Sequence, residues 1–190
     1  MRIGVLALQG DYDKHLQMLG KLGVDAVPVR TAEEVRQLDG VIIPGGESTT
    51  IGKLMQRFGI DDAIVERVEQ GMALYGTCAG LILMANDIED SDQHRLGLLD
   101  ITVRRNAFGR QIDSFETDMQ IPELGPDPIR AVFIRAPFVT EIRNGARTLA
   151  AIDGRPVLIQ RGKLLASSFH PELTDDTRLH EYFLSLVAGR

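Results

Sequence analysis

Gly76-Thr77-Cys78-Ala79-Gly80 holds the only cysteine of the chain, and an apolar run flanks it on each side, at residues 72–75 and 81–85. Glycines around a reactive side chain are typical of a sharp turn from strand to helix, because only residues without bulk let neighbouring backbone pass so closely. The free N–H groups at the start of the following helix favour thiolate over thiol. The pattern predicts that Cys78 is a nucleophile lifted clear of the sheet at an exposed turn.

A cysteine nucleophile needs a base, and Ser168-Phe169-His170-Pro171-Glu172 offers one further along the chain. His170 would take the thiol proton, and Glu172 would orient the imidazole. The alternative is an inert buried cysteine, which is the commoner role of a lone intracellular thiol. The paired glycines and the His-Pro-Glu sequence together favour the catalytic interpretation.

Outward from the cysteine, apolar runs rich in Val, Ile and Leu alternate with amphipathic segments. This alternation predicts a mostly parallel central sheet with helices on both faces. The expected first four strands are residues 3–8, 24–29, 41–43 and 72–75. Helices are expected after Asp11, from the capping box that begins at Thr31, and over residues 61–70.

The second half of the chain predicts a smaller antiparallel portion that carries the base. Its expected strands are short and separated by turn residues: 98–103, 129–134, 156–160 and 164–169. A closing helix is expected over residues 174–187, with His180 on its polar face, while His15 and His94 are expected to be surface or structural residues. No repeat or linker divides the sequence, so we expect one α/β domain over residues 1–190.

Composition narrows the function. The net charge is −6 with no basic run, which argues against a nucleic-acid partner. One cysteine excludes an internal disulfide and fits a reducing compartment, and the apolar start is too short for a signal peptide, so a cytoplasmic location is expected. The longest uncharged stretch, residues 71–86, is shorter than the ~20 residues that cross a bilayer.

Pro44-Gly45-Gly46-Glu47-Ser48-Thr49 follows the third expected strand, where open parallel sheets bind ligands. Acyl transfer to a cysteine creates an oxyanion that needs two N–H donors. The amide of Ala79 and one from the Gly45-Gly46 turn, assigned to Gly46, would supply them. A plain turn is the alternative. A phosphate loop is excluded, because five residues instead of four separate Gly46 from Gly52-Lys53 and Leu54 replaces the serine or threonine that binds magnesium.

These motifs carry a family resemblance. Cys78 in its glycine turn and the later His-Pro-Glu resemble a class I glutamine amidotransferase, in particular the glutaminase subunits of pyridoxal 5′-phosphate synthases, the PdxT/SNO type. The motifs that carry this closer resemblance are residues 44–49, 78 with its flanking turn, 105–111, 133–137 and 168–174. They occur in the same order, and the resemblance runs from residue 5 to residue 174, which is almost the whole chain.

The resemblance implies a flavodoxin-like α/β fold and hydrolysis of L-glutamine to L-glutamate and ammonia through a γ-glutamyl thioester. Cys78, His170 and Glu172 would form the catalytic triad, with Gly46 and Ala79 as the oxyanion donors. The glutamine contacts that it implies are Gly46, Glu47, Ser48, Arg105, Ile134 and Arg135. One arginine would pair with the α-carboxylate of glutamine, although each arginine taken alone is more commonly a solvated surface charge.

The resemblance also implies a partner. Ammonia would pass to a separate synthase subunit of the PdxS type, which builds pyridoxal 5′-phosphate in a hetero-oligomer. Pyridoxal phosphate would then be the product of the assembly, so no cofactor and no metal is expected in this subunit.

Two other classes remain open. A cysteine peptidase or deglycase of the PfpI type shares the fold and turn, but its histidine usually follows the cysteine directly, where this chain has Ala79. A non-catalytic regulatory subunit would be expected to have lost a triad position, whereas all three are present.

Overall fold

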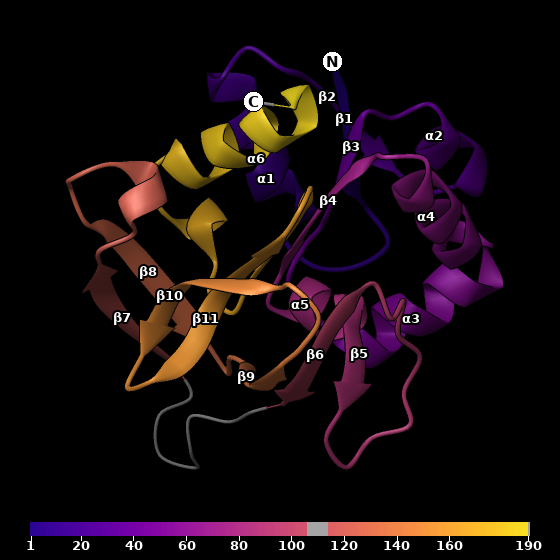
Figure 1. The fold of residues 1–190 in the computed structure, drawn as a ribbon. Coiled ribbons are helices and arrows are strands. Elements are labelled where there is room, and N and C mark those ends of the chain that lie inside the picture. The colour runs from indigo at the N-terminus through magenta and orange to yellow at the C-terminus, as the bar shows by residue number, and fades with distance from the viewer. Residues whose placement is uncertain (106–113, 190) are drawn as a thin grey trace.

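The computed structural model describes residues 1–105 and 114–189, and a seven-stranded sheet forms its centre (Figure 1). The strand order is β10-β11-β12-β4-β3-β1-β2. Five neighbouring strands are parallel: β1 (Arg2–Leu6), β2 (Asp25–Val29), β3 (Gly40–Ile43), β4 (Ala73–Thr77) and β12 (Leu164–Ser167). At one edge, β11 (Arg155–Arg161) and β10 (Arg147–Ile152) continue the sheet antiparallel. The parallel order β2-β1-β3-β4-β12 is the flavodoxin-like one, as expected.

Helices cover both faces of this sheet (Figure 1). One face carries α1 (Tyr12–Lys21) and α6 (Arg178–Ala188). The other carries α2 (Ala32–Arg36), α3 (Ser48–Arg57), α4 (Ile60–Glu69) and α5 (Ala79–Met84). A hydrophobic core lies on each face of the sheet, and successive side chains of β4 point into opposite cores. Leu74 packs in the core under α3 to α5, and Tyr75 packs with Phe183 of α6 in the other.

Two smaller sheets pack against the central one. The first consists of β5 (Ala85–Ile88), β6 (Leu99–Arg104) and β9 (Phe138–Ile142), and the second is the hairpin of β7 (Ser114–Met119) and β8 (Ile129–Ile134). Short 3₁₀ turns occur at η1 (Pro122–Leu124) and η2 (Pro171–Leu173). Ile101 joins the core on the α5 face, and Phe133 joins the opposite core, where its ring lies 5.6 Å from that of Phe169.

The expected strands of the first half are confirmed with small shifts at their ends, and so is the capping box. The Thr31 hydroxyl accepts from the Glu34 amide at 3.3 Å, while the Glu34 carboxylate accepts from the Thr31 amide at 3.0 Å. Helix α3 was not predicted, although its apolar residues Ile51 and Met55, one helical turn apart, are both buried. The strands β5, β7, β9 and β10 were also missed.

Residues 164–169 were expected to form a strand of an antiparallel portion, and this prediction is wrong for one of the two neighbours of the strand. β12 pairs antiparallel with β11 but parallel with β4, with Leu165 opposite Tyr75. Its side chains are buried, as befits the centre of a sheet covered on both faces. The base therefore follows a parallel strand next to the strand of the nucleophile.

The closing helix differs in two respects from its prediction. α6 begins at Arg178 instead of residue 174, because Asp176 accepts from the Arg178 amide at 3.0 Å and ends the preceding loop. His180 does not lie on a polar face: its side chain is fully buried, and so is that of His15. Both rings lie near Tyr75, in the core between α1, α6 and β4.

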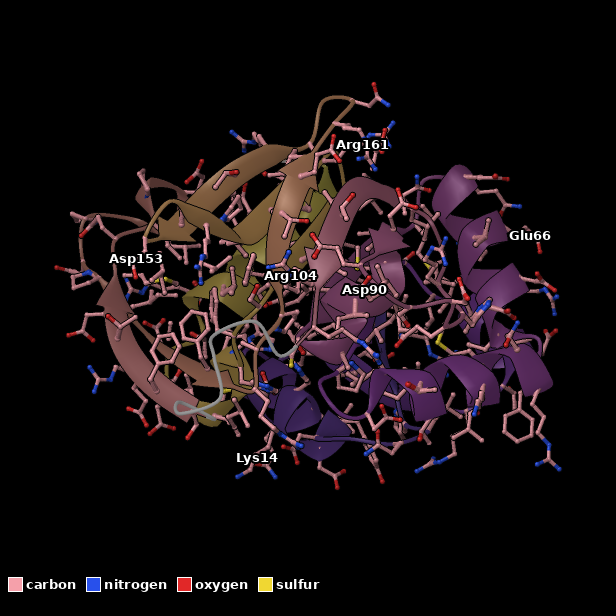
Figure 2. All side chains as sticks on the ribbon, turned by 90° about the horizontal axis from the view of Figure 1, so that it is seen from below. Lys14, Glu66, Asp90, Arg104, Asp153 and Arg161 are labelled. Carbon is pink, nitrogen blue, oxygen red and sulfur yellow. The ribbon has the colours of Figure 1, made fainter. Side chains whose placement is uncertain are left out.

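Charged side chains cover the outside, as Figure 2 shows for Lys14 on α1 and Glu66 on α4. Across residues 1–105 and 114–189, no helix is long and apolar enough to cross a membrane.

Candidate active site

The turn around Cys78 is a strained junction of β4 and α5. Cys78 has φ 50° and ψ −99°, a backbone region that L-residues rarely occupy. The flanking glycines are required by packing. A Cβ at Gly76 would lie 2.5 Å from the carbonyl carbon of Gly80, and a Cβ at Gly80 would lie 2.3 Å from the Ile43 carbonyl oxygen of β3. The structure therefore bears out the steric reason for expecting glycines on both sides of the nucleophile.

The prediction that Cys78 sits at an exposed turn is wrong. The residue is only 8% exposed, because the end of β8 covers it and the Ile134 carbonyl oxygen lies 3.9 Å from its Sγ. A long-range partner of this kind leaves no signal in the local sequence. The sulfur is instead reached through a cavity.

His170 and Glu172 stand just after β12, beside the end of β4. The His170 amide donates to the Val132 carbonyl of β8 at 2.8 Å, which fixes the backbone of this segment. His170 Nδ1 lies 2.7 Å from Glu172 Oε1, so the ring donates its Nδ1–H to the carboxylate and leaves Nε2 for Cys78. Both side chains are buried.

The electrostatics favour a protonated imidazole next to the sulfur. Burial lowers the pKa of His170, but the hydrogen bond with Cys78 and the carboxylate of Glu172 outweigh it and raise the pKa to about 10. Burial would raise the pKa of Glu172, yet the neighbouring rings of His15 and His170 outweigh it and lower the pKa. A protonated His170 beside Cys78 is the environment in which a cysteine acts as a thiolate nucleophile.

A cavity of about 460 Å³ opens onto Cys78 and has room for a small polar molecule. It is lined by every residue predicted for the site except Glu172, which lies behind His170: Gly46, Glu47, Ser48, Cys78, Ala79, Arg105, Ile134, Arg135 and His170. Gln9, Gly10, Asp11, Gly45 and Ile82 complete the lining. The structure thus brings together one reactive sulfur, one imidazole and two cationic side chains.

The Gly45-Gly46 turn packs directly on the imidazole. A Cβ at Gly45 would lie 2.4 Å from His170 Cε1, and a Cβ at Gly10 would lie 1.9 Å from the Gly45 carbonyl oxygen. The Glu47 amide donates to Gln9 Oε1 at 2.7 Å, which ties the turn to the segment after β1. The carboxylate of Glu47 caps α3 by accepting from the Thr50 amide at 2.8 Å.

Comparison with known proteins identifies the family of the chain. The profile of the SNO glutamine amidotransferase family matches residues 5–188. This chain belongs to that family. It is 52% identical over 187 residues to a pyridoxal 5′-phosphate synthase subunit PdxT of Carboxydothermus hydrogenoformans, covering 98% of each chain. It is 53% identical over 187 residues to the PdxT subunit of Moorella thermoacetica, covering 98% of this chain and all of the relative. A solved structure described as a glutamine amidotransferase superposes with a TM-score of 0.93 at 51% identity, covering 98% of both chains.

Two cationic side chains line the cavity that opens onto Cys78. Arg105 and Arg135 both line the cavity and are exposed. Arg135 has a positive φ of 43°, which directs the chain sharply away after β8. The rest of the motif that begins at Arg105, residues 106–111, lies outside the described residues.

Sequence reasoning missed Gln93, which lies in a polar stretch that matched no family motif. Its Oε1 accepts from Arg105 Nη1 at 2.8 Å, and its Nε2 donates to Ser48 Oγ at 3.1 Å. One amide thus connects two of the predicted glutamine contacts. His94 is half-buried and pairs with Asp61 at 3.0 Å, which agrees with a structural role. Among the described residues, no group of three His, Cys, Asp or Glu side chains could hold a metal ion.

Proposed function

We propose that this chain hydrolyses L-glutamine to L-glutamate and ammonia as the glutaminase subunit of a pyridoxal 5′-phosphate synthase. The observation that carries the proposal is a cavity lined by Cys78 and His170, with Glu172 hydrogen-bonded to the far side of the imidazole, in a chain of the SNO glutamine amidotransferase family. The similarity to relatives named PdxT extends over 98% of this chain and supports the same activity.

In the first half-reaction, the Cys78 thiolate attacks the carbon of the side-chain carboxamide. Protonated His170 then gives its proton to the departing nitrogen, so the C–N bond breaks and ammonia leaves. The product is a γ-glutamyl thioester on Cys78. In the second half-reaction, His170 takes a proton from water, the hydroxide attacks the thioester carbon, and glutamate departs as the C–S bond breaks. Glu172 holds the imidazole throughout.

Each tetrahedral intermediate carries an oxyanion, for which we assign the amides of Ala79 and Gly46 as donors. The Ala79 amide begins α5 and has no partner from an earlier helical turn, and Gly46 lines the same cavity. Loss of one such donor costs about 10²–10³ in rate.

Selection of glutamine is assigned to six residues that line the cavity: Gly46, Glu47, Ser48, Arg105, Ile134 and Arg135. Free glutamine has an α-carboxylate and an α-ammonium, so its site needs a cation and several acceptors. Arg105 or Arg135 supplies the cation. A charge-assisted hydrogen bond of this kind is worth about 1.5–3 kcal/mol.

The proposed partner is a synthase subunit of the PdxS type. Ammonia is protonated in water near neutral pH and loses its nucleophilicity, so it must reach the second active site by a shielded path. The product of the assembly is pyridoxal 5′-phosphate, and this subunit needs neither a cofactor nor a metal. We propose that residues 1–190 form a single domain and that the chain acts in the cytoplasm, where Cys78 stays reduced.

The test measures glutamate release from L-glutamine by the chain alone and with a synthase subunit, beside Cys78→Ala. We expect hydrolysis that requires Cys78, rises with the synthase subunit and leaves a γ-glutamyl adduct trapped by acid quench. Absence of glutamine hydrolysis in both samples would refute the proposal. Cleavage of peptides or of glycated thiols would favour the peptidase or deglycase class instead.

A further inference from the structure

A chain of buried polar side chains continues behind the triad, from Glu172 into the core between α1 and α6. His15 Nε2 lies 3.4 Å from Glu172 Oε2 and 3.2 Å from Thr77 Oγ1, and His15 Nδ1 lies 2.9 Å from His180 Nε2. His15, Thr77 and His180 are all fully buried. Burial lowers the pKa of both imidazoles, so they are buried uncharged, and burying two such rings is costly unless their nitrogen atoms have partners.

The position of His15 links the two halves of the triad. Thr77 directly precedes the nucleophile on β4, and Glu172 holds the base after β12, so one ring nitrogen of α1 faces both segments. Glu172 Oε1 receives the His170 proton, whereas Oε2 has no hydrogen-bond partner among the described residues. The 3.4 Å separation to His15 is longer than the usual range of about 2.7–3.2 Å. The contact is therefore electrostatic, and a small shift of the ring would turn it into a hydrogen bond.

The tautomers of His15 and His180 follow from the donors and acceptors around their ring nitrogens. If His180 donates from Nε2 to His15 Nδ1, then His15 carries its proton on Nε2, directed at Thr77 and Glu172, and His180 Nδ1 is a bare acceptor. The opposite arrangement puts the His180 proton on Nδ1, which is buried without a partner among the described residues, and aims the His15 Nε2 lone pair at a carboxylate. A buried N–H without an acceptor and a lone pair that faces a carboxylate are both unfavourable. The arrangement with the His15 proton on Nε2 is therefore the more stable one.

We propose that His15 is a positioning residue of the glutaminase reaction, which holds Glu172 and the Thr77 end of the nucleophile turn through its Nε2–H, and that His180 fixes this tautomer. The donors then all lead to the carboxylate: His180 donates to His15, His15 points its N–H toward Glu172, and His170 donates to Glu172 from the other side. The carboxylate is held from both sides and cannot rotate away from His170 when His170 becomes charged. This inference rests on the proposed function for its kinetic test, though its structural test does not.

The first experiment observes the cluster in the unaltered chain, and single variants serve only to assign its signals. Proton-detected ¹⁵N NMR of the intact chain with labelled histidine reports which ring nitrogen carries the proton, and the four histidines are assigned with single variants, His94→Asn among them. We expect His15 and His180 to carry protons on Nε2 and to have bare Nδ1 atoms near neutral pH. A proton on His15 Nδ1 would overturn the proposal, whatever the chain hydrolyses.

The second experiment compares two amide variants of His15, to tell whether the residue positions Glu172 or only fills space. In His15→Gln the amide nitrogen replaces Nε2 and keeps the donor toward Glu172, whereas in His15→Asn the shorter amide replaces Nδ1 and loses it. His94→Asn is the matched control, since His94 pairs with Asp61 away from the triad. We expect His15→Asn to lower kcat for glutamine about tenfold with unchanged KM, and His15→Gln to restore most of it.

Alkylation of Cys78 by iodoacetamide gives a readout that does not depend on the substrate, because the chain has one cysteine. Loss of the His15 donor makes Glu172 easier to protonate, so the acidic limb of the rate profile should move to higher pH in His15→Asn. The titratable groups around this cluster are Asp11, Tyr75, His170, Glu172 and His180. If Asn and Gln are equally active and their alkylation profiles match the His94 control, His15 only packs, and the proposal is wrong.

Discussion

Gly45→Ala tests how closely the Gly45-Gly46 turn must approach the catalytic imidazole. The added methyl carbon would lie 2.4 Å from His170 Cε1, 3.0 Å from His170 Nδ1 and 3.5 Å from Cys78 Cβ. Carbon atoms pack at about 3.5–4.0 Å, so the ring or the turn must move by about 1 Å or more. His170 cannot retreat without lengthening its 2.7 Å hydrogen bond to Glu172.

The displacement sets the size of the effect. A misplacement of about 1 Å at a reacting group lowers the rate about 10²-fold. If the turn moves instead, the Gly46 amide leaves its position in the cavity, and the loss of one oxyanion donor has a similar effect of about 10²–10³. Either response predicts a fall in kcat of at least about a hundredfold.

The assay is steady-state glutamate release, with circular dichroism and thermal unfolding as checks on the fold. Gly20→Ala in α1 is the matched control, because a Cβ at Gly20 meets nothing within 4 Å. That variant should keep its kcat and gain about 0.5–1 kcal/mol in unfolding free energy. If Gly45→Ala folds and retains kcat within about threefold, the close approach of the turn to His170 plays no part in the reaction.

Three other perturbations test the triad, the binding residues and the buried histidines. Glu172→Gln should lower kcat, though less than His170→Asn, which should cost several orders of magnitude; equal losses, measured by glutamate release, would contradict the assigned roles. Arg105→Ala should raise KM for glutamine at little cost in kcat, and Gln93→Ala should do the same more weakly, because Gln93 accepts from Arg105 Nη1 at 2.8 Å; unchanged KM in both would place the α-carboxylate elsewhere. Burial lowers the pKa of His180 to about 3, so below about pH 6.5 the unfolded chain binds one more proton at this residue and stability falls as pH falls. His180→Gln should therefore flatten the slope of unfolding free energy between about pH 4 and 6 by about 1.4 kcal/mol per pH unit, as measured by urea unfolding, and an unaltered slope would show that His180 is charged in the folded chain.

The chemistry of the site was predictable from sequence because its parts are local. Paired glycines around Cys78 and the closely spaced His170 and Glu172 each form a short motif, and the strand ends that carry them follow from apolar runs. The pairing of strands was harder to predict from the sequence. Residues 164–169 were expected in the antiparallel portion, but β12 pairs with β4, which precedes it by a long stretch of chain. Apolar patterning shows that a strand is buried, not which strand lies next to it.

The error on His180 has a similar origin, and His15, which was expected to be a surface or structural residue, is buried for the same reason. A histidine on an amphipathic helix is usually placed on the polar side by its periodicity, and both helices otherwise follow that pattern. Their rings turn inward because each supplies the partner of the other, from opposite ends of the chain, at 2.9 Å. The sequence did not predict Gln93 as a site residue for the same reason: its hydrogen bonds with Ser48 and Arg105 join segments that are far apart in the sequence.

The site divides into a catalytic part and a binding part with different structural origins. Cys78 and His170 follow the adjacent parallel strands β4 and β12, and the Gly45-Gly46 turn follows β3, so the central sheet fixes the reacting groups at its carboxyl edge. Arg105 follows β6 and Arg135 follows β8, which belong to the two smaller sheets. A change in the central sheet or in the buried cluster behind it should therefore alter kcat. A change in the sheet of β6 can move Arg105 while the contacts of β8 with the triad stay in place, so it should alter KM more than kcat. A change in β8 should alter both, because the Val132 carbonyl accepts from the His170 amide at 2.8 Å and the Ile134 carbonyl lies 3.9 Å from Cys78 Sγ.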